Sequence, residues 1–322
     1  MLTDKANTIC LLHILREYSD ADHILPMREI IGKFSTLYGL TVDRRTVYSS
    51  IEILRKLDYD IALYSENNIG YYLRSREIDK PEVRLLVDAV CSFPFISAGQ
   101  AKNLVNELQA QLSIYDRDKY KHLMVMRQER KTQNKQVFLN IEMLDEAIER
   151  NQKVSFTYMT YNINKTLVPR RKEEYRADPL RLIFTNEHYY LICVRGGYEN
   201  VSMYRIDRMR DIVIEDEERT VVIQGKVLTA AVDDAVYAFA GAPEQIVLRC
   251  STDILNDIID KFGQSIKIED EDDTVLITFT APPQGIKFWA LQYLPYVEVL
   301  QPVWLREQVI ESVENNPYMQ DR

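Results

Sequence analysis

The sequence predicts an α+β protein built from several domains. Its 322 residues correspond to two or three domains of about 100–200 residues each. Helical periodicity dominates the first 57 residues, strand-like runs gather between residues 154 and 204, and strands alternate with helices from residue 244 onward. Hydrophobic residues make up 46% and charged residues 28%, which is ordinary globular usage and argues against a disordered chain.

The N-terminal region predicts three short helices. Apolar residues recur at helical spacing in residues 5–18, 26–38 and 43–57. Pro26 suits the start of the second helix and Gly39 its end. Thr41 or Asp43 caps the third helix, because both side chains can accept a hydrogen bond from a free backbone N–H.

A small hairpin follows the third helix. Residues 59–64 and 70–73 alternate like strands, and Ser-Glu-Asn-Asn at 65–68 joins them. Three helices and a hairpin within about 75 residues predict a winged helix-turn-helix, a DNA-binding domain, over residues 1–76.

The third helix divides into two faces. One arc is apolar: Val47, Ile51, Leu54 and Leu57. The opposite arc is polar and carries four cations, as a helix that enters the major groove requires. The predicted DNA contacts are Arg44, Arg45, Thr46, Tyr48, Ser49, Arg55 and Lys56, with Asn68 and Tyr71 in the hairpin. A solvated amphipathic helix and a plain hairpin tip are the structural alternatives.

Three further segments complete the predicted organisation. Residues 77–136 are helical apart from breaks near residues 92–94 and 97–99, and predict a connector that can also serve as a dimer contact. Residues 137–220 predict a helix followed by strands, and residues 221–322 predict an α+β extension.

The charge is unusual for a protein that binds nucleic acid. The net charge is −9, whereas such proteins are usually basic. The charge is segregated, however. Residues 250–273 hold eight acidic residues against two lysines, and residues 117–135 hold seven basic residues against two acidic ones. Local patches therefore decide binding, and non-specific affinity for DNA should be modest.

Several motifs together resemble bacterial WYL-domain transcriptional regulators. Residues 41–54 resemble the helix-turn-helix that opens these proteins. The Trp-Tyr-Leu run that names the family matches His-Tyr-Tyr-Leu-Ile at 188–192, with Tyr189 in place of the tryptophan. The family's basic signature resembles Tyr-Arg-Ile-Asp-Arg-Met at 204–209. The usual C-terminal extension resembles residues 288–306, although Leu-Pro-Tyr at 294–296 replaces an expected glycine.

This resemblance implies a middle domain that is a small, strongly bent, Sm-like β-barrel and that senses an effector, either a nucleic acid or a nucleotide. Arginines suit phosphates, and tyrosines supply stacking faces for bases. The predicted effector-binding residues are Tyr158, Arg176, His188, Tyr190, Arg205 and Arg208. Alternatively, Arg205 and Arg208 pair with Asp207, Asp211 or Glu199, and one of Tyr189 and Tyr190 packs in the core.

No enzyme signature is present in the sequence: it lacks GxSxG, GxGxxG, HExxH and a Walker loop. The four histidines are scattered, so we expect neither a metal nor a cofactor. Cys193 near His188 lies in an apolar run, where core packing is the better interpretation than a catalytic thiol. The four cysteines are expected to be reduced. With no run of about 18 apolar residues, the protein is expected to be cytoplasmic.

The sequence therefore predicts a homodimeric regulator that binds double-stranded DNA and responds to a nucleic-acid or nucleotide effector. Two alternatives stay open. One is an accessory protein, for instance of a defence system, whose main task is binding single strands. The other is an enzyme that acts on nucleotides. The operator, the effector and the direction of regulation do not follow from the sequence.

Overall fold

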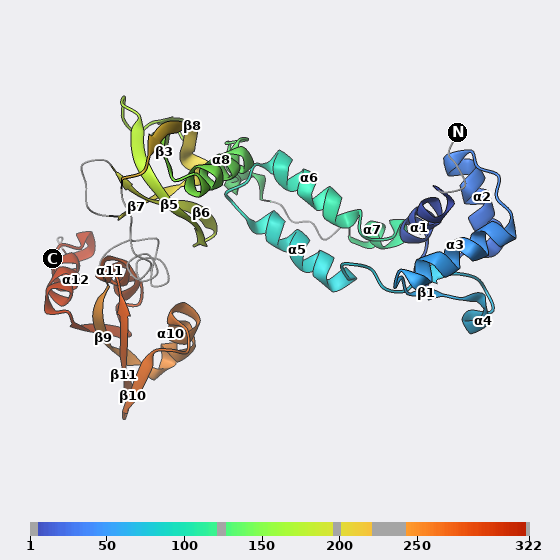
Figure 1. The fold of residues 1–322 in the computed structure, drawn as a ribbon. Helices are drawn as coiled ribbons and strands as arrows, with labels where there is room; N and C mark the ends of the chain where they lie inside the picture. Colours follow the sequence, from blue (N-terminus) through green and yellow to red (C-terminus); the bar gives the residue numbers. More distant parts are fainter. Residues whose placement is uncertain (1–5, 121–126, 196–200, 221–242, 320–322) are drawn as a thin grey trace. The chain divides into compact units, whose positions relative to one another are not determined.

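The computed structural model describes residues 6–120, 127–195, 201–220 and 243–319. The chain forms two compact units, Met1–Lys135 and Gln136–Arg322 (Figure 1). The first unit contains both the predicted DNA-binding domain and most of the predicted connector. The predicted extension starts at residue 221, and its first residues, up to 242, lie outside the described ranges.

The first unit begins with three helices, α1 (Asn7–Tyr18), α2 (Met27–Tyr38) and α3 (Arg44–Lys56). Pro26 precedes α2, and Gly39 ends it in the left-handed conformation, with φ at 66°. Asp43 caps α3, since its side chain accepts a hydrogen bond from the Thr46 N–H at 2.8 Å. The helices bury one common core: Leu11, Ile14, Leu15, Ile30, Phe34, Val47, Ile51 and Leu54.

The predicted hairpin forms, but with a different tip. Strands β1 (Ile61–Ala62) and β2 (Tyr72–Leu73) pair antiparallel, and between them lies one helical turn, α4 (Tyr64–Asn67). Asn67 holds the chain after this turn, because its side-chain oxygen accepts hydrogen bonds from the backbone N–H groups of residues 69 and 70. Tyr71 bridges to Leu25, so closely that a Cβ at Gly70 would lie 2.1 Å from the Leu25 carbonyl oxygen. Glycine is therefore required at position 70.

Helices continue the first unit: α5 (Lys80–Ser92), α6 (Ala98–Gln109), α7 (Ile114–Tyr120) and the short turn Gln128–Arg130. The predicted breaks coincide with the end of α5 and with the start of α6, where Ser97 caps the helix. Helices α5 and α6 share a small core made of Val83, Val87, Cys91, Val105 and Leu112. Lys131 is buried, and its ammonium donates to the carbonyl groups of Val90 and Phe93 at the end of α5.

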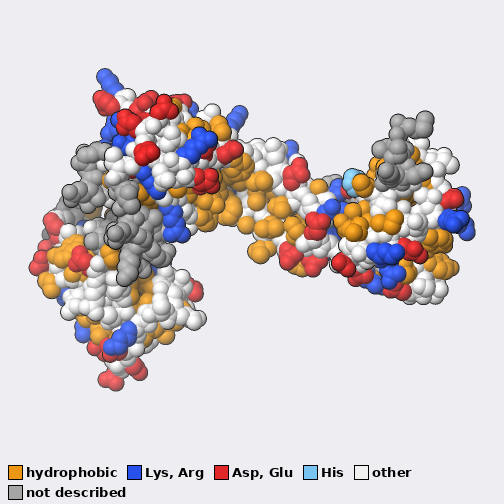
Figure 2. Space-filling view, viewed as in Figure 1, with side chains coloured by type: hydrophobic (Ala, Val, Ile, Leu, Met, Phe, Trp, Pro, Cys, Tyr) orange, Lys and Arg blue, Asp and Glu red, His pale blue; other side chains and the backbone are white. Residues whose placement is uncertain are grey.

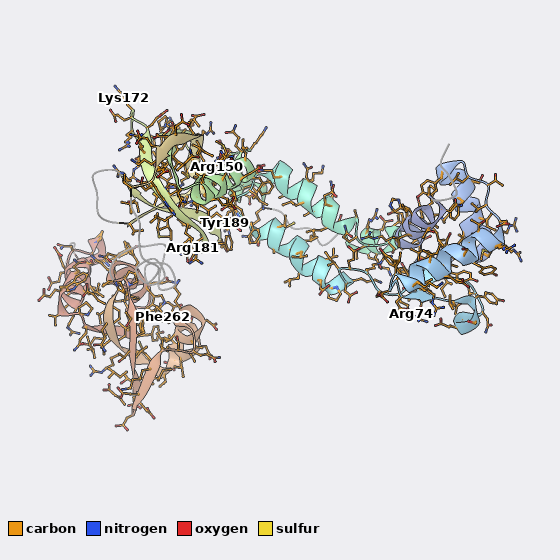
Figure 3. All side chains as sticks on the ribbon, in the orientation of Figure 1. Arg74, Arg150, Lys172, Arg181, Tyr189 and Phe262 are labelled. Carbon is orange, nitrogen blue, oxygen red and sulfur yellow. The ribbon has the colours of Figure 1, made fainter. Side chains whose placement is uncertain are left out.

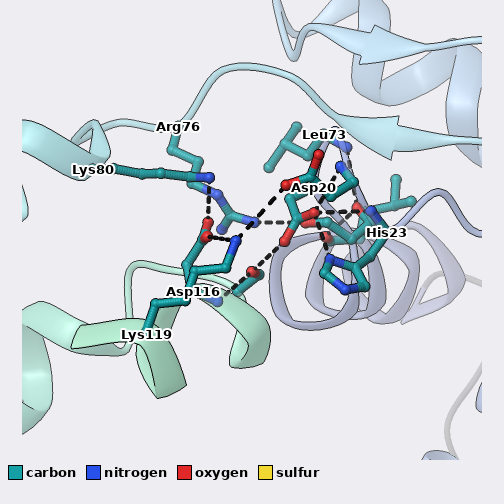
Figure 4. A network of polar contacts seen from close by, with 11 residues as sticks. Asp20, His23, Leu73, Arg76, Lys80, Asp116 and Lys119 are labelled. Carbon is teal, nitrogen blue, oxygen red and sulfur yellow. Dashed lines mark hydrogen bonds and ion pairs between the residues drawn. The ribbon is translucent and has the colours of Figure 1, made fainter. Parts of the chain in front are cut away.

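A buried polar network fastens the three N-terminal helices to α7 (Figure 4). Asp20 is 5% exposed and accepts hydrogen bonds from the Ser113 hydroxyl at 2.7 Å and from the His23 ring at 2.8 Å. Asp116, 1% exposed, pairs with Lys80 at 2.7 Å. Arg76 donates to the carbonyl oxygens of residues 19 and 111. Because buried charges are stable only when paired, this network holds the two parts in one geometry.

Asp20 gives the network a testable dependence on pH. Burial alone would raise the pKa of Asp20, but hydrogen bonds from Ser113, His23 and the backbone lower it below its ordinary value. A lowered pKa stabilises the fold above the unfolded-state pKa, and this stabilisation is lost as the pH falls through the folded-state pKa. We expect Asp20→Asn to cost about 1–3 kcal/mol at pH 7.

The difference between the wild type and Asp20→Asn should shrink below about pH 4, where the wild-type carboxylate also takes up a proton. Urea unfolding of the full chain at pH 7 and below about pH 4, followed by circular dichroism, measures this difference in the free energy of unfolding. Asp22→Asn is the matched control, since the Asp22 side chain is 72% exposed. Equal destabilisation by both variants at pH 7 would show that the network adds no stability.

The second unit opens with helix α8 (Val137–Glu149), which packs on a strongly curled antiparallel sheet. The strands are β3 (Gln152–Tyr161), β4 (Leu167–Pro169), β5 (Tyr175–Thr185), β6 (His188–Arg195), β7 (Val201–Arg205) and β8 (Met209–Glu218). Strand β3 pairs with β4, β5 and β8, and the order continues from β5 to β6 and β7. The inner core holds Leu144, Phe156, Tyr175, Leu191, Tyr204 and Met209.

The last part of the chain is a four-stranded antiparallel sheet with helices. Its elements are β9 (Glu244–Ser251), the turn Thr252–Ile254, α10 (Leu255–Phe262), β10 (Lys267–Glu271), β11 (Thr274–Ala281), α11 (Pro283–Gln292), β12 (Val297–Gln301), α12 (Val303–Glu314) and the turn Pro317–Met319. The sheet order is β10-β11-β9-β12, the arrangement of a ferredoxin-like split β-α-β unit. Trp289, 2% exposed, is central to its core and contacts Phe262, which Figure 3 labels.

Candidate functional site

The exposed face of α3 carries the predicted DNA contacts. Arg44, Arg45, Tyr48, Ser49, Arg55 and Lys56 are all exposed, and Thr46 is half-buried. Among the described residues, none of the four cations has an ion pair. The buried face holds Val47, Ile51 and Leu54, as the helical periodicity predicts. Figure 2 shows cationic side chains on the surface of this region. The face therefore presents four positive charges to solvent.

Leu57 does not belong to the apolar face of α3. The periodicity predicts a buried side chain, but Leu57 is 62% exposed, because the helix ends at Lys56 and Asp58 takes a positive φ of 65°. The buried apolar face of α3 therefore ends at Leu54.

The two hairpin residues lie in different environments. Asn68 is exposed and ends α4 in the left-handed conformation. Tyr71 is only 5% exposed, with its ring 6.4 Å from that of Tyr48. Burial and a hydrogen bond with Tyr48 raise the pKa of Tyr71 to about 12. The predicted surface role of Tyr71 is therefore corrected: this side chain supports Tyr48 from the core.

The second candidate site lies at the end of β7, where the chain enters the turn Ile206–Arg208. Arg205 donates two hydrogen bonds to the carboxylate of Asp207, at 3.0 and 2.8 Å. Asp207 is 5% exposed, so the pair is largely buried. This is the pairing that the sequence left open, and it neutralises the charge of Arg205.

Arg208 is placed differently from Arg205. Its Nε atom is buried and has no hydrogen-bond partner among the described residues, and its guanidinium lies 5.9 Å from the ring centre of Tyr161. An unpartnered buried donor is costly, and this cost is removed when an acceptor arrives. Arg208 thus differs from Arg205 in having a guanidinium donor that no described residue uses.

Two tyrosines frame the turn. Tyr190 lies directly opposite Arg205 across the β6–β7 ladder and is half-buried. Tyr158 is 8% exposed and its ring packs 4.9 Å from that of Tyr204, so it offers no free stacking face. Instead, its hydroxyl accepts the Arg205 N–H at 3.3 Å. Burial raises the pKa of both hydroxyls, which keeps them protonated.

The aromatic pair at 189 and 190 is divided between the two faces of the sheet. Tyr189, labelled in Figure 3, packs beside the inner core, while Tyr190 packs against a second cluster with Ile192 and Met203. The alternation predicts this division.

His188 is half-buried next to Tyr190, and its ring nitrogen lies 2.8 Å from the Asn186 carbonyl oxygen. Burial lowers the pKa of His188, so its ring is neutral at pH 7 and brings no charge to the site.

Arg176 is engaged away from this turn. Its guanidinium binds Glu215 at 2.5 Å and Glu217 at 2.6 Å, both on β8. No described contact joins it to Tyr190, Arg205 or Arg208. Lys165 is exposed in the turn before β4, and Arg170 is exposed in the segment after it. Arg171, in the same segment, is half-buried: its guanidinium donates to the carbonyl oxygens of residues 173 and 174 and lies 3.7 Å from the ring centre of Tyr175. Lys172 lies at the outer end of this segment (Figure 3).

Sequence reasoning missed Asn140. This side chain is 3% exposed in α8, and its amide donates to the carbonyl oxygens of Ile206 and Met209, at 3.3 and 2.9 Å. It therefore holds both ends of the turn that carries Asp207 and Arg208. A polar residue in the apolar run Val-Phe-Leu-Asn-Ile was the available signal.

Other chemistry is limited in the part of the chain that the structure describes. Cys193 is fully buried, which raises its pKa to about 12 and keeps the thiol protonated. No group of three or more metal-binding side chains gathers within the described residues. None of the described helices is long and apolar enough to cross a membrane.

Comparisons with solved structures give distant likenesses. The chain is 14% identical to a CRISPR Cas-related protein, with a TM-score of 0.39, covering 74% of this chain and 73% of that one. It is 14% identical to the proteasome accessory factor B/C (PafBC) of Arthrobacter aurescens, with a TM-score of 0.28, covering 97% of this chain and 48% of that one. It thus spans about half the length of PafBC. No curated protein matches the chain.

Family models match the two halves of the second unit. Residues 140–214 match the WYL domain, which includes the turn with Arg205 and Arg208, and residues 242–315 match the WCX domain. The chain therefore contains a WYL domain followed by a WCX domain.

Proposed function

We propose that the protein is a DNA-binding transcriptional regulator that acts as a homodimer and whose WYL domain senses a nucleic-acid or nucleotide effector. Residues 1–76 act as a winged helix-turn-helix, α3 enters the major groove, and the curled sheet of the WYL domain acts as a small Sm-like barrel. The observation that carries this proposal is the exposed face of α3. Its four cations have no ion pair with any described residue, whereas the opposite face of α3 is buried in the core through Val47, Ile51 and Leu54.

The chemistry of α3 suits duplex DNA. Arginine forks match guanine edges and phosphates, and Tyr48 and Ser49 add hydrogen-bonding groups on the same exposed face. A dimer would place two such helices in successive major grooves, one helical turn of about 34 Å apart. The acidic remainder of the protein limits non-specific binding, so sequence-selective contacts matter more for this protein than for a basic one.

The turn at Arg208 suits a phosphate. Asp207 neutralises Arg205, the tyrosines are protonated and His188 is neutral, which leaves Arg208 as the uncompensated charge among these groups. Tyr190 beside it can stack on a base. Binding there would change the DNA affinity only if the effector prefers one of two states of the protein.

A salt-series titration tests the proposal. The protein is titrated against its own promoter duplex and, in parallel, against single-stranded oligonucleotides of mixed sequence. Tight, sequence-selective binding to the duplex, with affinity falling as salt rises, is the expected result. Binding to single strands alone would replace the regulator by an accessory single-strand-binding protein, and turnover of a nucleotide would indicate an enzyme.

A further inference from the structure

Helix α5 exposes apolar side chains that its own unit does not cover. Leu85 is 70% exposed and Leu86 is 40% exposed, in the middle of a helix of 13 residues. Figure 2 shows hydrophobic side chains gathered over this helix. Single exposed leucines are common on protein surfaces, but two adjacent ones on a long, regular helix mark a surface that is suited to a partner.

The opposite face of α5 is already used. Val83, Val87 and Cys91 recur every four residues and pack against Val105 and Leu112. At about 100° per residue, Leu85 and Ala89 lie nearly opposite that stripe. The outer face therefore has Leu85 beside the small Ala89, with Leu86 on one flank and Arg84 and Asp88 on the other.

The charges on α5 have a symmetry that indicates what covers this face. Arg84 and Asp88 lie equally far from Leu86, one on each side. In a contact across a twofold axis perpendicular to the helix, two copies of α5 run antiparallel and the same flanks meet. Arg84 of one copy then faces Asp88 of the other, twice, and the Leu86 side chains meet near the axis.

The side chains can make these contacts. Arg84 and Asp88 now pair within the helix at 2.8 Å, with 40% and 48% of their side chains exposed. Such an exposed pair within a helix is weak, so exchanging it for a pair between copies costs little. Leu85 of one copy would fill the space beside Ala89 of the other.

We infer that α5 is a homodimer contact, formed by two antiparallel copies packed through Leu85, Leu86 and Ala89 and flanked by reciprocal pairs of Arg84 and Asp88. Only the role of this contact, which is to set the distance between two copies of α3, rests on the proposed function as a regulator. Its test needs no DNA, so failure of this contact and failure of DNA binding are distinguishable.

Charge exchange tests the contact on the full-length protein. In Arg84→Asp each α5 carries two acidic residues on this flank, and in Asp88→Arg it carries two basic ones. Each variant alone should dimerise at least about tenfold more weakly than the wild type, because like charges meet across the axis. An equimolar mixture of the two variants should recover dimers, since opposite charges meet again. Sedimentation velocity over a micromolar concentration series measures both effects.

The mixture separates the contact from effects inside one helix, because mixing leaves the charges within each copy unchanged. Leu85→Glu should also give monomers, while Ile163→Glu is the matched control, since Ile163 is 97% exposed elsewhere. Circular dichroism checks folding, and if Leu85→Glu misfolds, the charge variants decide. A monomeric wild type, or dimers that persist in both single variants without any effect of mixing, would overturn the inference.

Discussion

Replacing Arg44 and Arg45 together with alanine should remove most of the affinity for promoter DNA. Both guanidinium groups are exposed in the first turn of α3 and have no ion pair among the described residues, so their removal disturbs no internal ion pair there. At about 1–3 kcal/mol for each arginine, the double substitution should cost about 2–6 kcal/mol, which lowers the affinity at least about thirtyfold. Fluorescence anisotropy with the promoter duplex measures the decrease.

The salt dependence of the double variant tells phosphate contacts from base contacts. Each phosphate that the protein no longer neutralises should lower the slope of log affinity against log salt by about 0.9, whereas removing a bond to a base leaves the slope unchanged. A control that removes two cations from the second unit, Arg150→Ala with Lys165→Ala, should keep the wild-type affinity. If the control weakens binding as much as the α3 variant does, general charge and not α3 governs the affinity.

The second large effect is expected at Arg208. Methionine keeps much of the length of this side chain but removes the guanidinium, so Arg208→Met should weaken binding of a single-stranded oligonucleotide by about tenfold to a hundredfold, the cost of one charged hydrogen-bonding group. Thermal stability should be unchanged or higher, because the buried Nε has no hydrogen-bond partner among the described residues. Titration of the oligonucleotide and a melting curve on the same sample measure both quantities.

Arg205 must be tested differently. Arg205→Ala alone would remove two hydrogen bonds from the buried carboxylate of Asp207 and would destabilise the turn, so a decrease in binding would be ambiguous. The double variant Arg205→Gln with Asp207→Asn removes both charges while keeping hydrogen-bonding groups. Arg150→Met controls for the removal of a positive charge, since Arg150 is 62% exposed. If Arg208→Met binds the oligonucleotide as tightly as Arg150→Met, the ligand does not occupy this turn.

The spacing of apolar residues predicts the helices well, because one face of each helix must be buried in the core. Val47, Ile51 and Leu54 had to face a core, and Pro26, Gly39 and Asp43 had to mark helix ends. It fails where the backbone leaves the regular pattern. Leu57 belongs by its spacing to a helix that has already ended, and β8 does not stand out in the sequence, because a positive φ at Asp211 interrupts its alternation.

The candidate sites could be predicted by residue type but not by partner. Tyr71 lies next to a strand of only two residues, which is too short for a pattern to tell a buried face from an exposed one. Arg176 and Arg208 are both arginines in a basic region. One binds two glutamates across β3, and the other has an Nε without a partner among the described residues. Only the fold of the sheet brings Glu215 and Glu217 to Arg176, over a sequence separation that no local pattern spans.

Asn140 links α8 rigidly to the turn at residues 206–208. One amide group satisfies carbonyl oxygens on both sides of the turn, so sliding or rotating α8 by one residue would break both bonds at once. Each hydrogen bond lost in this way would cost about 0.5–1.5 kcal/mol. Helix α8 starts at Val137, only two residues after the first unit ends at Lys135. A ligand that displaced this turn would therefore also move α8, the helix that follows the first unit in the chain.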